Sequence, residues 1–372
     1  MILCEDGPDG RPVLFRDAAR IIVAETADQV IPALQEIEAA RAKGAWVAGW
    51  VGYEAGLAME PHLLPLMRLP EGEPLLAFGI YDRPEAAPVL PAETVLLSDM
   101  TPLISCDDYH AAFARLSDYI DQGDCYQVNL TFPMEGRLEQ GTAAGLYSAL
   151  SRVQSVRHGA LVDLGVGPII LSRSPELFFR LDSDMRIEAQ PMKGTAPRHS
   201  DPARDHASAD ELFRSEKNRA ENLMIVDLLR NDISRLAEIG SVRVPELFQV
   251  EPFATVHQMT SRITGKLLGR PGLDQLMRAL FPCGSVTGAP KIRAMQIIAE
   301  LEHQARGVYC GAIGWMAPEG RASFNVAIRT LRLFADGRII LNVGGGIVHD
   351  SKADNEWEEA LWKARFADLN RR

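Results

Sequence analysis

The apolar segments of this chain follow one another as strand-like runs joined by turns, without regular alternation with helices. The clearest case is the pair Ala322–Phe334 and Arg338–Val343, which Ala335-Asp336-Gly337 connects. Asp-Gly between two apolar runs is a strong signal for a β-hairpin. Strands that follow one another through hairpins favour antiparallel pairing over βαβ units. The sequence therefore predicts an α+β fold with a large, mainly antiparallel sheet system that carries helices.

Composition narrows the class of protein. The chain has 372 residues, with 39 Lys and Arg against 50 Asp and Glu and a net charge of −11. An acidic chain is a poor ligand for nucleic acid or for an anionic membrane surface, so neither is expected as a partner. We find no secretory signal and no apolar run long enough to span a bilayer. The five scattered cysteines indicate neither a zinc site nor a disulfide framework, and they favour the cytoplasm.

Helices are predicted where apolar residues recur at helical spacing between capping residues and a terminating glycine. Their expected ranges are 107–121, 210–238, 272–280, 290–302 and 353–369. Strands are expected in the first hundred residues at 46–51 and 75–81, where they alternate with Pro-rich loops. Further strands are expected at 160–166, 169–171, 176–181, 185–190, 242–244, 255–264 and 308–316, beside the hairpin above.

Two helices carry glutamates that are candidates for a metal site. Glu221 falls on the apolar stripe of its helix, where a carboxylate must be paired, protonated or metal-bound. Glu356, Glu359 and Lys363 share one face of the last helix. Carboxylates from two helices suit a hard cation such as Mg²⁺. The alternatives are a Glu221–Lys217 pair and a solvated Glu-Lys face, and the pattern alone does not decide between them.

Three other features point to an anionic small molecule. The glycines Gly344-Gly345-Gly346 follow a strand, and their amides suit an oxyanion, although a tight turn or bulge explains them equally well. Arg329 lies in an apolar strand, where it needs a bound carboxylate or an internal salt bridge. Lys193 lies between two prolines, and it is either a nucleophile in a pocket or a surface charge. These features indicate an enzyme for a small carboxylate.

Five motifs occur in one order and carry a resemblance to a known family. They are Ser174-Pro175-Glu176, Pro191-Met-Lys-Gly-Thr-Ala-Pro-Arg198, Arg219-Ala-Glu-Asn-Leu-Met-Ile-Val-Asp227, Thr287-Gly-Ala-Pro-Lys291 and Gly344-Gly-Gly-Ile-Val348. From about Ser105 to the C-terminus the chain resembles the chorismate-utilising enzymes. The resemblance implies two large, mainly antiparallel sheets sandwiched between helical layers. It also implies a reduced N-terminal portion (1–104) packed onto a catalytic domain (105–372).

The resemblance further implies a reaction and roles for named residues. Lys193 is the residue that family members forming 4-amino-4-deoxychorismate, for 4-aminobenzoate and folate synthesis, carry at this position. Lys193 is implied as the nucleophile and Glu176 as the general acid and base. The implied substrate-binding residues are Arg329, Lys363, Gly344, Gly345, Gly346, His257 and Ser285, and the implied Mg²⁺ ligands are Glu221, Glu359 and Glu356. Four glutamates (Glu176, Glu221, Glu356 and Glu359) face three cations (Lys193, Arg329 and Lys363), so the expected pocket carries a net negative charge. Bound Mg²⁺ would make this pocket attractive to dianionic chorismate.

Further expectations concern the surroundings of the metal, the source of ammonia and the alternative functions. Many relatives have an acidic residue where this chain has Asn218, which removes a charge near the expected metal. We find no glutaminase motif, so ammonia is expected from a separate glutamine amidotransferase subunit. Two alternatives remain: an anthranilate synthase component, and a non-catalytic relative that acts as an interaction subunit.

Overall fold

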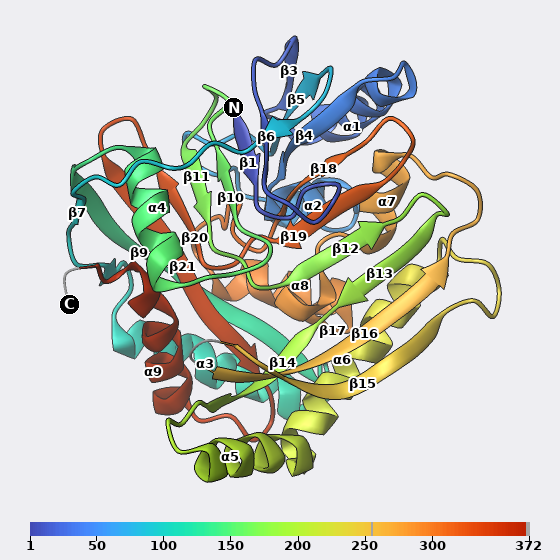
Figure 1. Cartoon of the computed structure of the whole chain (residues 1–372). Helices are drawn as coiled ribbons and strands as arrows, with labels where there is room; N and C mark the ends of the chain where they lie inside the picture. The colour runs from blue at the N-terminus through green and yellow to red at the C-terminus, as the bar shows by residue number, and fades with distance from the viewer. Residues whose placement is uncertain (254–255, 370–372) are drawn as a thin grey trace.

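The computed structural model describes residues 1–253 and 256–369, and within them two large sheets contain all the strands (Figure 1). The first sheet has the order β17-β9-β21-β20-β11-β10-β1-β2-β6, with β7 and β8 also paired to β9. Its strands are β1 (Ile2–Cys4), β2 (Val13–Phe15), β6 (Glu85–Ala86), β7 (Leu96–Leu97), β8 (Thr101–Pro102), β9 (Gln127–Gln140), β10 (Ala160–Val162), β11 (Ile169–Ser172), β17 (Gly288–Ala289), β20 (Thr330–Leu333) and β21 (Arg338–Ile347).

The second sheet has the order β14-β16-β13-β12-β19-β18-β4-β5-β3, with β15 also paired to β16. Its strands are β3 (Arg20–Ala24), β4 (Trp46–Val51), β5 (Leu76–Tyr81), β12 (Leu177–Leu181), β13 (Arg186–Gln190), β14 (Met192–Pro197), β15 (Arg243–Pro252), β16 (Val256–Lys266), β18 (Ala312–Met316) and β19 (Ala322–Val326). Strand pairing is antiparallel in both sheets, for example β21 with β9 and β13 with β16. The predicted α+β class with two large antiparallel sheets is confirmed.

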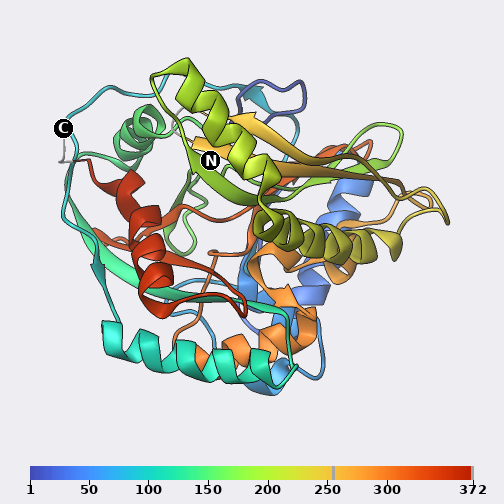
Figure 2. The same ribbon diagram turned by 90° about the horizontal axis from the view of Figure 1, so that it is seen from below.

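Helices cover the outer face of each sheet. The α-helices are α1 (Ala27–Ala42), α2 (Tyr53–Ala58), α3 (Cys106–Asp121), α4 (Ala143–Val153), α5 (Pro202–Arg214), α6 (Glu216–Ser234), α7 (Leu273–Leu280), α8 (Lys291–Leu301) and α9 (Ala353–Ala364). Helices α3, α4, α8 and α9 pack on the first sheet, and α1, α5 and α6 pack on the second. Figures 1 and 2 show α3, α5, α6 and α9 gathered at one end of the molecule. No helix among the described residues is long and apolar enough to cross a membrane.

Residues 1–104 supply strands to both sheets. Strand β1 pairs with β10 in the first sheet, and β4 pairs with β18 in the second. This segment also contains α1, a helix of 16 residues where the sequence predicted only strands and loops. Helix α1 contains Pro32, and its apolar residues Val30, Leu34 and Ile37 face the core. The division of the chain at residue 104 stays a prediction.

The helix expected over 210–238 is instead two helices. Helix α5 ends at Arg214 and α6 begins at Glu216, with Ser215 between them in an extended conformation. The Ser215 hydroxyl accepts a hydrogen bond from the amide of Asn218 at 3.3 Å and so caps α6. This break lets α6 begin beside β14, the strand that carries Lys193, because α6 packs on β14.

The strand expected over 322–334 is also two strands, and each belongs to a different sheet. Strand β19 ends at Val326 in the second sheet, and β20 begins at Thr330 in the first. Arg329 lies in the connection with a φ of +50°, a left-handed conformation that interrupts the alternation expected for a single strand.

Candidate active site

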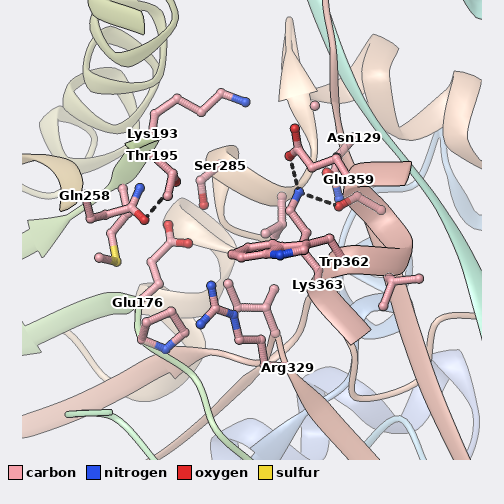
Figure 3. Close-up of a pocket in the computed structure, with 18 of the residues that line it drawn as sticks. Asn129, Glu176, Lys193, Thr195, Gln258, Ser285, Arg329, Glu359, Trp362 and Lys363 are labelled. Atoms are coloured by element: carbon pink, nitrogen blue, oxygen red, sulfur yellow. Dashed lines mark hydrogen bonds and ion pairs between the residues drawn. The ribbon is translucent and has the colours of Figure 1, made fainter. Parts of the chain in front are cut away.

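A cavity of about 490 Å³ lies between the two sheets and is bordered by two helices. The second sheet lines it through β14 and β16, and the first sheet lines it through β9 and β21. Helix α6 contributes Lys217, Asn218 and Glu221, and α9 contributes Glu356, Glu359, Trp362 and Lys363. Figure 3 shows side chains from these separate elements pointing into a common space.

Two crossing connections place Glu176 and Arg329 in this cavity. Residues 173–176 lead from β11 in the first sheet to β12 in the second, and residues 327–329 lead from β19 back to β20. The connections run side by side, because Arg173 N donates to Arg329 O at 2.9 Å and Val326 N donates to Glu176 O at 3.1 Å. The backbone therefore fixes the acid and the arginine relative to each other.

Glu176 is buried and its carboxyl group lacks a full set of partners. Burial raises the pKa of Glu176 to about 7, although the Ser285 hydroxyl and the charges of Lys193 and Arg329 each lower it. No described residue donates a hydrogen bond to Oε1 of Glu176. A carboxyl group with this pKa holds a proton in a large share of molecules near neutral pH and can both donate and accept one.

The guanidinium of Arg329 is a cation without a paired anion. Burial lowers the pKa of Arg329 to about 10, and the nearby Glu176 charge only partly offsets this. Within the part of the chain that the structure describes, no side chain or backbone group accepts a hydrogen bond from this guanidinium. Figure 3 shows it turned toward the cavity below Glu176. Such a group suits a ligand carboxylate, which can accept two parallel hydrogen bonds from it.

The side chain of Lys193 extends from β14 across the cavity to the wall formed by β21. Its ammonium lies 3.4 Å from Oε2 of Glu221, so Glu221 pairs with Lys193 and no ion pair joins it to Lys217 among the described residues. A Cβ at position 346 would lie 2.8 Å from Nζ of Lys193. Because glycine has no side chain, the ammonium group of Lys193 can occupy the space beside Gly346.

The three glycines lie within a regular strand and form neither a turn nor a loop. Gly344, Gly345 and Gly346 belong to β21 and lie opposite Thr131, Leu130 and Asn129 of β9. A Cβ at position 345 would lie 3.1 Å from Oε2 of Glu356 and 3.4 Å from Nζ of Lys363. Glycine at these positions therefore lets the side chains of α9 lie close to β21. Any larger side chain there would fill the cavity where α9 faces β21.

The three candidate metal ligands line the cavity, but each already has its own partner. Besides the Glu221–Lys193 pair, Glu359 pairs with Lys363 at 2.7 Å, and Glu356 accepts a hydrogen bond from Ser351 at 2.7 Å. Burial raises the pKa of Glu356. Burial also acts to raise the pKa of Glu359, but the ammonium groups of Lys363, Lys193 and Lys217 together outweigh it and lower that pKa. No group of three or more potential ligands among the described residues is close enough to hold an ion. The oxygen donors suit Mg²⁺ by type, but they are not gathered around one point.

The family assignment rests on a match along almost the whole chain. The family model described as chorismate binding enzyme matches residues 2–368. This chain belongs to the chorismate-binding enzymes. The family resemblance that the motifs predicted is therefore confirmed, and the cavity described above is the candidate active site of a chorismate-binding enzyme.

Relatives of this chorismate-binding enzyme include aminodeoxychorismate synthase component 1 of Klebsiella aerogenes, 43% identical over 76% of this chain and 64% of that protein. The protein of that name from Escherichia coli K12 is 44% identical over 72% of this chain and 58% of its own length. Anthranilate synthase component 1 of Streptomyces coelicolor is 42% identical over 68% of this chain and 49% of that protein. The matched segments thus cover less than two thirds of these relatives.

A solved structure shares the fold. Anthranilate synthase component I from Streptococcus pneumoniae superimposes with a TM-score of 0.83 at 27% identity, covering 95% of this chain and 91% of that one. Relatives with two different product names therefore share this architecture, so the fold alone does not select the reaction.

One predicted site residue lies outside the cavity of this chorismate-binding enzyme. His257 does not line it; instead its ring contacts Asp205 of α5 at 2.9 Å. Neighbouring residues on a strand point to opposite faces, and in β16 it is Val256 and Gln258 that face the cavity. The other predicted residues (Lys193, Glu176, Arg329, Lys363, Gly344, Gly345, Gly346, Ser285, Glu221, Glu356 and Glu359) all line it.

Sequence reasoning missed several residues of the lining. Lys217 faces the cavity one turn before Glu221, and Asn129, Gln258, Tyr309 and Trp362 also line it. With Lys217 the lining holds four cations against four glutamates, so the net negative pocket expected from the sequence is wrong. The sequence offers Lys217 only as a possible ion-pair partner of Glu221, and it carries no signal for the other four residues.

Proposed function

We propose that this chain is a cytoplasmic enzyme that converts chorismate and ammonia to 4-amino-4-deoxychorismate for 4-aminobenzoate and folate synthesis. One observation carries the proposal: a single cavity presents an amine on Lys193, a proton-holding carboxyl group on Glu176 and an unpaired Arg329. These groups match what the substitution needs, namely a nucleophile, an acid for a poor leaving group and a cation for a carboxylate.

The proposed reaction has two halves. The neutral amine of Lys193 adds to C2 of chorismate, the ring double bonds shift, and the C4–O bond breaks while Glu176 donates its proton, so that water leaves. The nitrogen of Lys193 keeps both of its protons, so the covalent intermediate is a secondary ammonium that can leave again as a neutral amine. Ammonia then adds at C4 as the C2–N bond breaks, the double bonds return, and Lys193 is restored. Glu176, now a carboxylate, accepts a proton from the added ammonia.

Two cations would bind the substrate carboxylates. Arg329 and Lys363 supply cations at separate points of the lining, and the Lys363 ammonium is held by Gly344 O at 2.9 Å and by Glu359. The β21 glycines keep this part of the cavity open for the enolpyruvyl group. Chorismate has two carboxylates, so two separated cations fit it better than a single cluster would.

A magnesium ion would be held by Glu221 and Glu359, with Glu356 assisting, and by oxygens of the substrate. It would supply positive charge at the ring carboxylate. The support is the donor type and the placement of all three glutamates in one lining. Because each glutamate now has another partner, we expect tight Mg²⁺ binding only when chorismate is also present.

Ammonia would come from a glutamine amidotransferase subunit. The bacterial relatives are named component 1, a name that points to a second component for those proteins. We expect this chain alone to use ammonium and to leave glutamine unchanged.

The decisive experiment incubates the protein with chorismate, Mg²⁺ and ammonium, and identifies products by mass spectrometry. Aminodeoxychorismate supports the proposal, whereas anthranilate identifies an anthranilate synthase and unchanged chorismate a non-catalytic relative. Lys193→Ala should abolish product, and Lys43→Ala, which changes an exposed lysine, should not. Full activity in Lys193→Ala would exclude the covalent route.

A further inference from the structure

The backbone that carries Lys193 departs from regular strand geometry. Pairing between β14 and β16 is regular at Met192 and at Thr195, with a register shift between them. Gly194 within this shift has a φ of +91°, which favours glycine. A turn outside the ladder lacks the hydrogen bonds that hold a strand, so other groups must fix its conformation.

Gln258 holds this turn from the side of β16. Its Nε2 donates to Gly194 O at 2.8 Å, and its Oε1 accepts from the Thr195 hydroxyl at 3.1 Å. Figure 3 shows the Thr195–Gln258 contact at the edge of the cavity, next to Lys193. One side chain thus bonds both residues that follow the lysine.

Asn218 closes the other side of the turn from α6. A Cβ at position 194 would lie 2.9 Å from Oδ1 of Asn218, so this amide lies directly against the glycine. Asn218 is itself fixed, because its Nδ2 donates to the Ser215 hydroxyl at 2.9 Å. Gly194 is therefore enclosed between two amide side chains, one from a strand and one from a helix.

Both of these side chains are uncharged, which matters next to a lysine. A carboxylate at position 218 or 258 would compete with Glu221 for the Lys193 ammonium. Neutral amides instead provide hydrogen bonds and packing without adding a charge to the cavity.

We propose that Gln258 and Asn218 are positioning residues that hold the Gly194 turn and thereby direct the Lys193 amine into the cavity beside Gly346. The proposal rests on the proposed function, because it concerns Lys193 as the nucleophile. Neither side chain takes part in bond making. Their role is to keep the lysine head in one place, and a displacement of about 1 Å at a reacting group costs roughly 100-fold in rate.

Gln258→Met tests this, because methionine has a similar length but makes neither hydrogen bond. We expect kcat to fall by roughly 10- to 100-fold while KM for chorismate changes by less than about threefold. Gln35→Met, at an exposed position on α1, is the matched control and should leave both constants unchanged. Equal losses in kcat and in 1/KM together with a lower Tm would overturn the proposal, and so would an unchanged kcat.

A second measurement does not depend on turnover. Acetic anhydride labelling without substrate, followed by peptide mass spectrometry, reports how accessible the Lys193 amine is. In Gln258→Met and Asn218→Ala we expect Lys193 to be labelled several-fold faster than in the wild type, with Lys43 unchanged as the internal reference. An unchanged labelling rate would overturn the positioning role, whereas absence of product from the wild type would count against the proposed function alone.

Discussion

The guanidinium groups of Arg306 and Arg329 differ in their surroundings, since Arg306 is fully buried and Arg329 is half-buried in the cavity wall. Arg306 donates two hydrogen bonds to Glu302 at 2.6 and 2.8 Å and two more to backbone carbonyls, and its guanidinium lies 4.5 Å from the ring of Tyr53. Despite burial, these partners raise the pKa of Arg306. Arg329 has no such partners among the described residues, and burial lowers its pKa to about 10.

The same contrast separates two buried glutamates. Burial raises the pKa of both Glu54 and Glu176 to about 7. Glu54 accepts hydrogen bonds from the amides of Arg306 and Gly307 at 2.7 and 3.0 Å, so its two oxygens are both bonded. Glu176 has an oxygen without a donor. The guanidinium of Arg306 and the carboxyl group of Glu54 find their hydrogen-bond partners within the protein, whereas Arg329 and Glu176 leave donors and an acceptor for a ligand.

The largest expected effect is on catalysis at Glu176. Glu176→Gln keeps the shape but cannot transfer a proton, so we expect kcat to fall by roughly 10²- to 10⁴-fold with Tm unchanged or higher. Glu54→Gln is the matched control and should leave kcat within about threefold. Steady-state kinetics and thermal unfolding of both variants check this, and a comparable kcat loss in Glu54→Gln would break the contrast.

The next effect is on stability at Arg306. Arg306→Met leaves Glu302 as a buried carboxylate without its cation, which costs roughly 3–5 kcal/mol of unfolding free energy. Urea denaturation measures this loss. A change below about 1 kcal/mol would mean that the network around Arg306 contributes little.

The pH dependence of stability should reveal the buried glutamates. Because the pKa of Glu176 is about 7 in the folded protein against 4.5 as reference, the folded state binds the proton more tightly. Stability is therefore highest below pH 4.5 with respect to this group, and it falls as pH rises to about 7, by about 3 kcal/mol. Denaturation of wild type and Glu176→Gln at several pH values tests this. In the variant, the part of the loss of unfolding free energy with rising pH that Glu176 contributes should be absent.

The smallest effect is expected at Arg329. Arg329→Met removes the cation for a substrate carboxylate, and a hydrogen bond to a charged group contributes about 1.5–3 kcal/mol, so KM for chorismate should rise roughly 10- to 100-fold. Tm should stay the same or increase, because no described residue loses a hydrogen bond. A clear drop in Tm without a change in KM would show that Arg329 is structural.

The sequence predicted β12, β13 and β21 because an apolar run or an apolar–polar alternation lies there between turn residues. It missed α1 because the prediction for the first hundred residues rests on their Pro-rich loops, which begin at Pro61, whereas α1 contains a single proline, Pro32, and packs on the core. It also joined α5 to α6, because Ser215 looks like an ordinary helical residue when the cap cannot be seen. Tertiary packing decided both cases.

For the site, the five motifs contain Glu176, Lys193, Glu221 and the three glycines, and residue patterns and the family resemblance supplied the rest. Eleven of the twelve named side chains or glycines line one cavity. His257 belongs to none of the five motifs, and strand alternation turns its side chain away from the cavity, toward Asp205. The partner of Glu221 was also beyond reach, since Lys193 is distant in sequence. The same is true of the roles of Gln258 and Asn218 beside Gly194, which depend on a register shift.

The paired connections that carry Glu176 and Arg329 also limit how this chain can change length. Strands β11 and β20 pair in one sheet, and β12 and β19 pair in the other, so a single two-stranded ribbon passes through both. If one residue were inserted between Val326 and Thr330, the side chains of either β19 or β20 would have to point to the opposite face of their sheet. A compensating insertion between Ser172 and Leu177 would then be needed. Chains of this type should therefore vary in length in their outer loops and keep these two short segments at constant length.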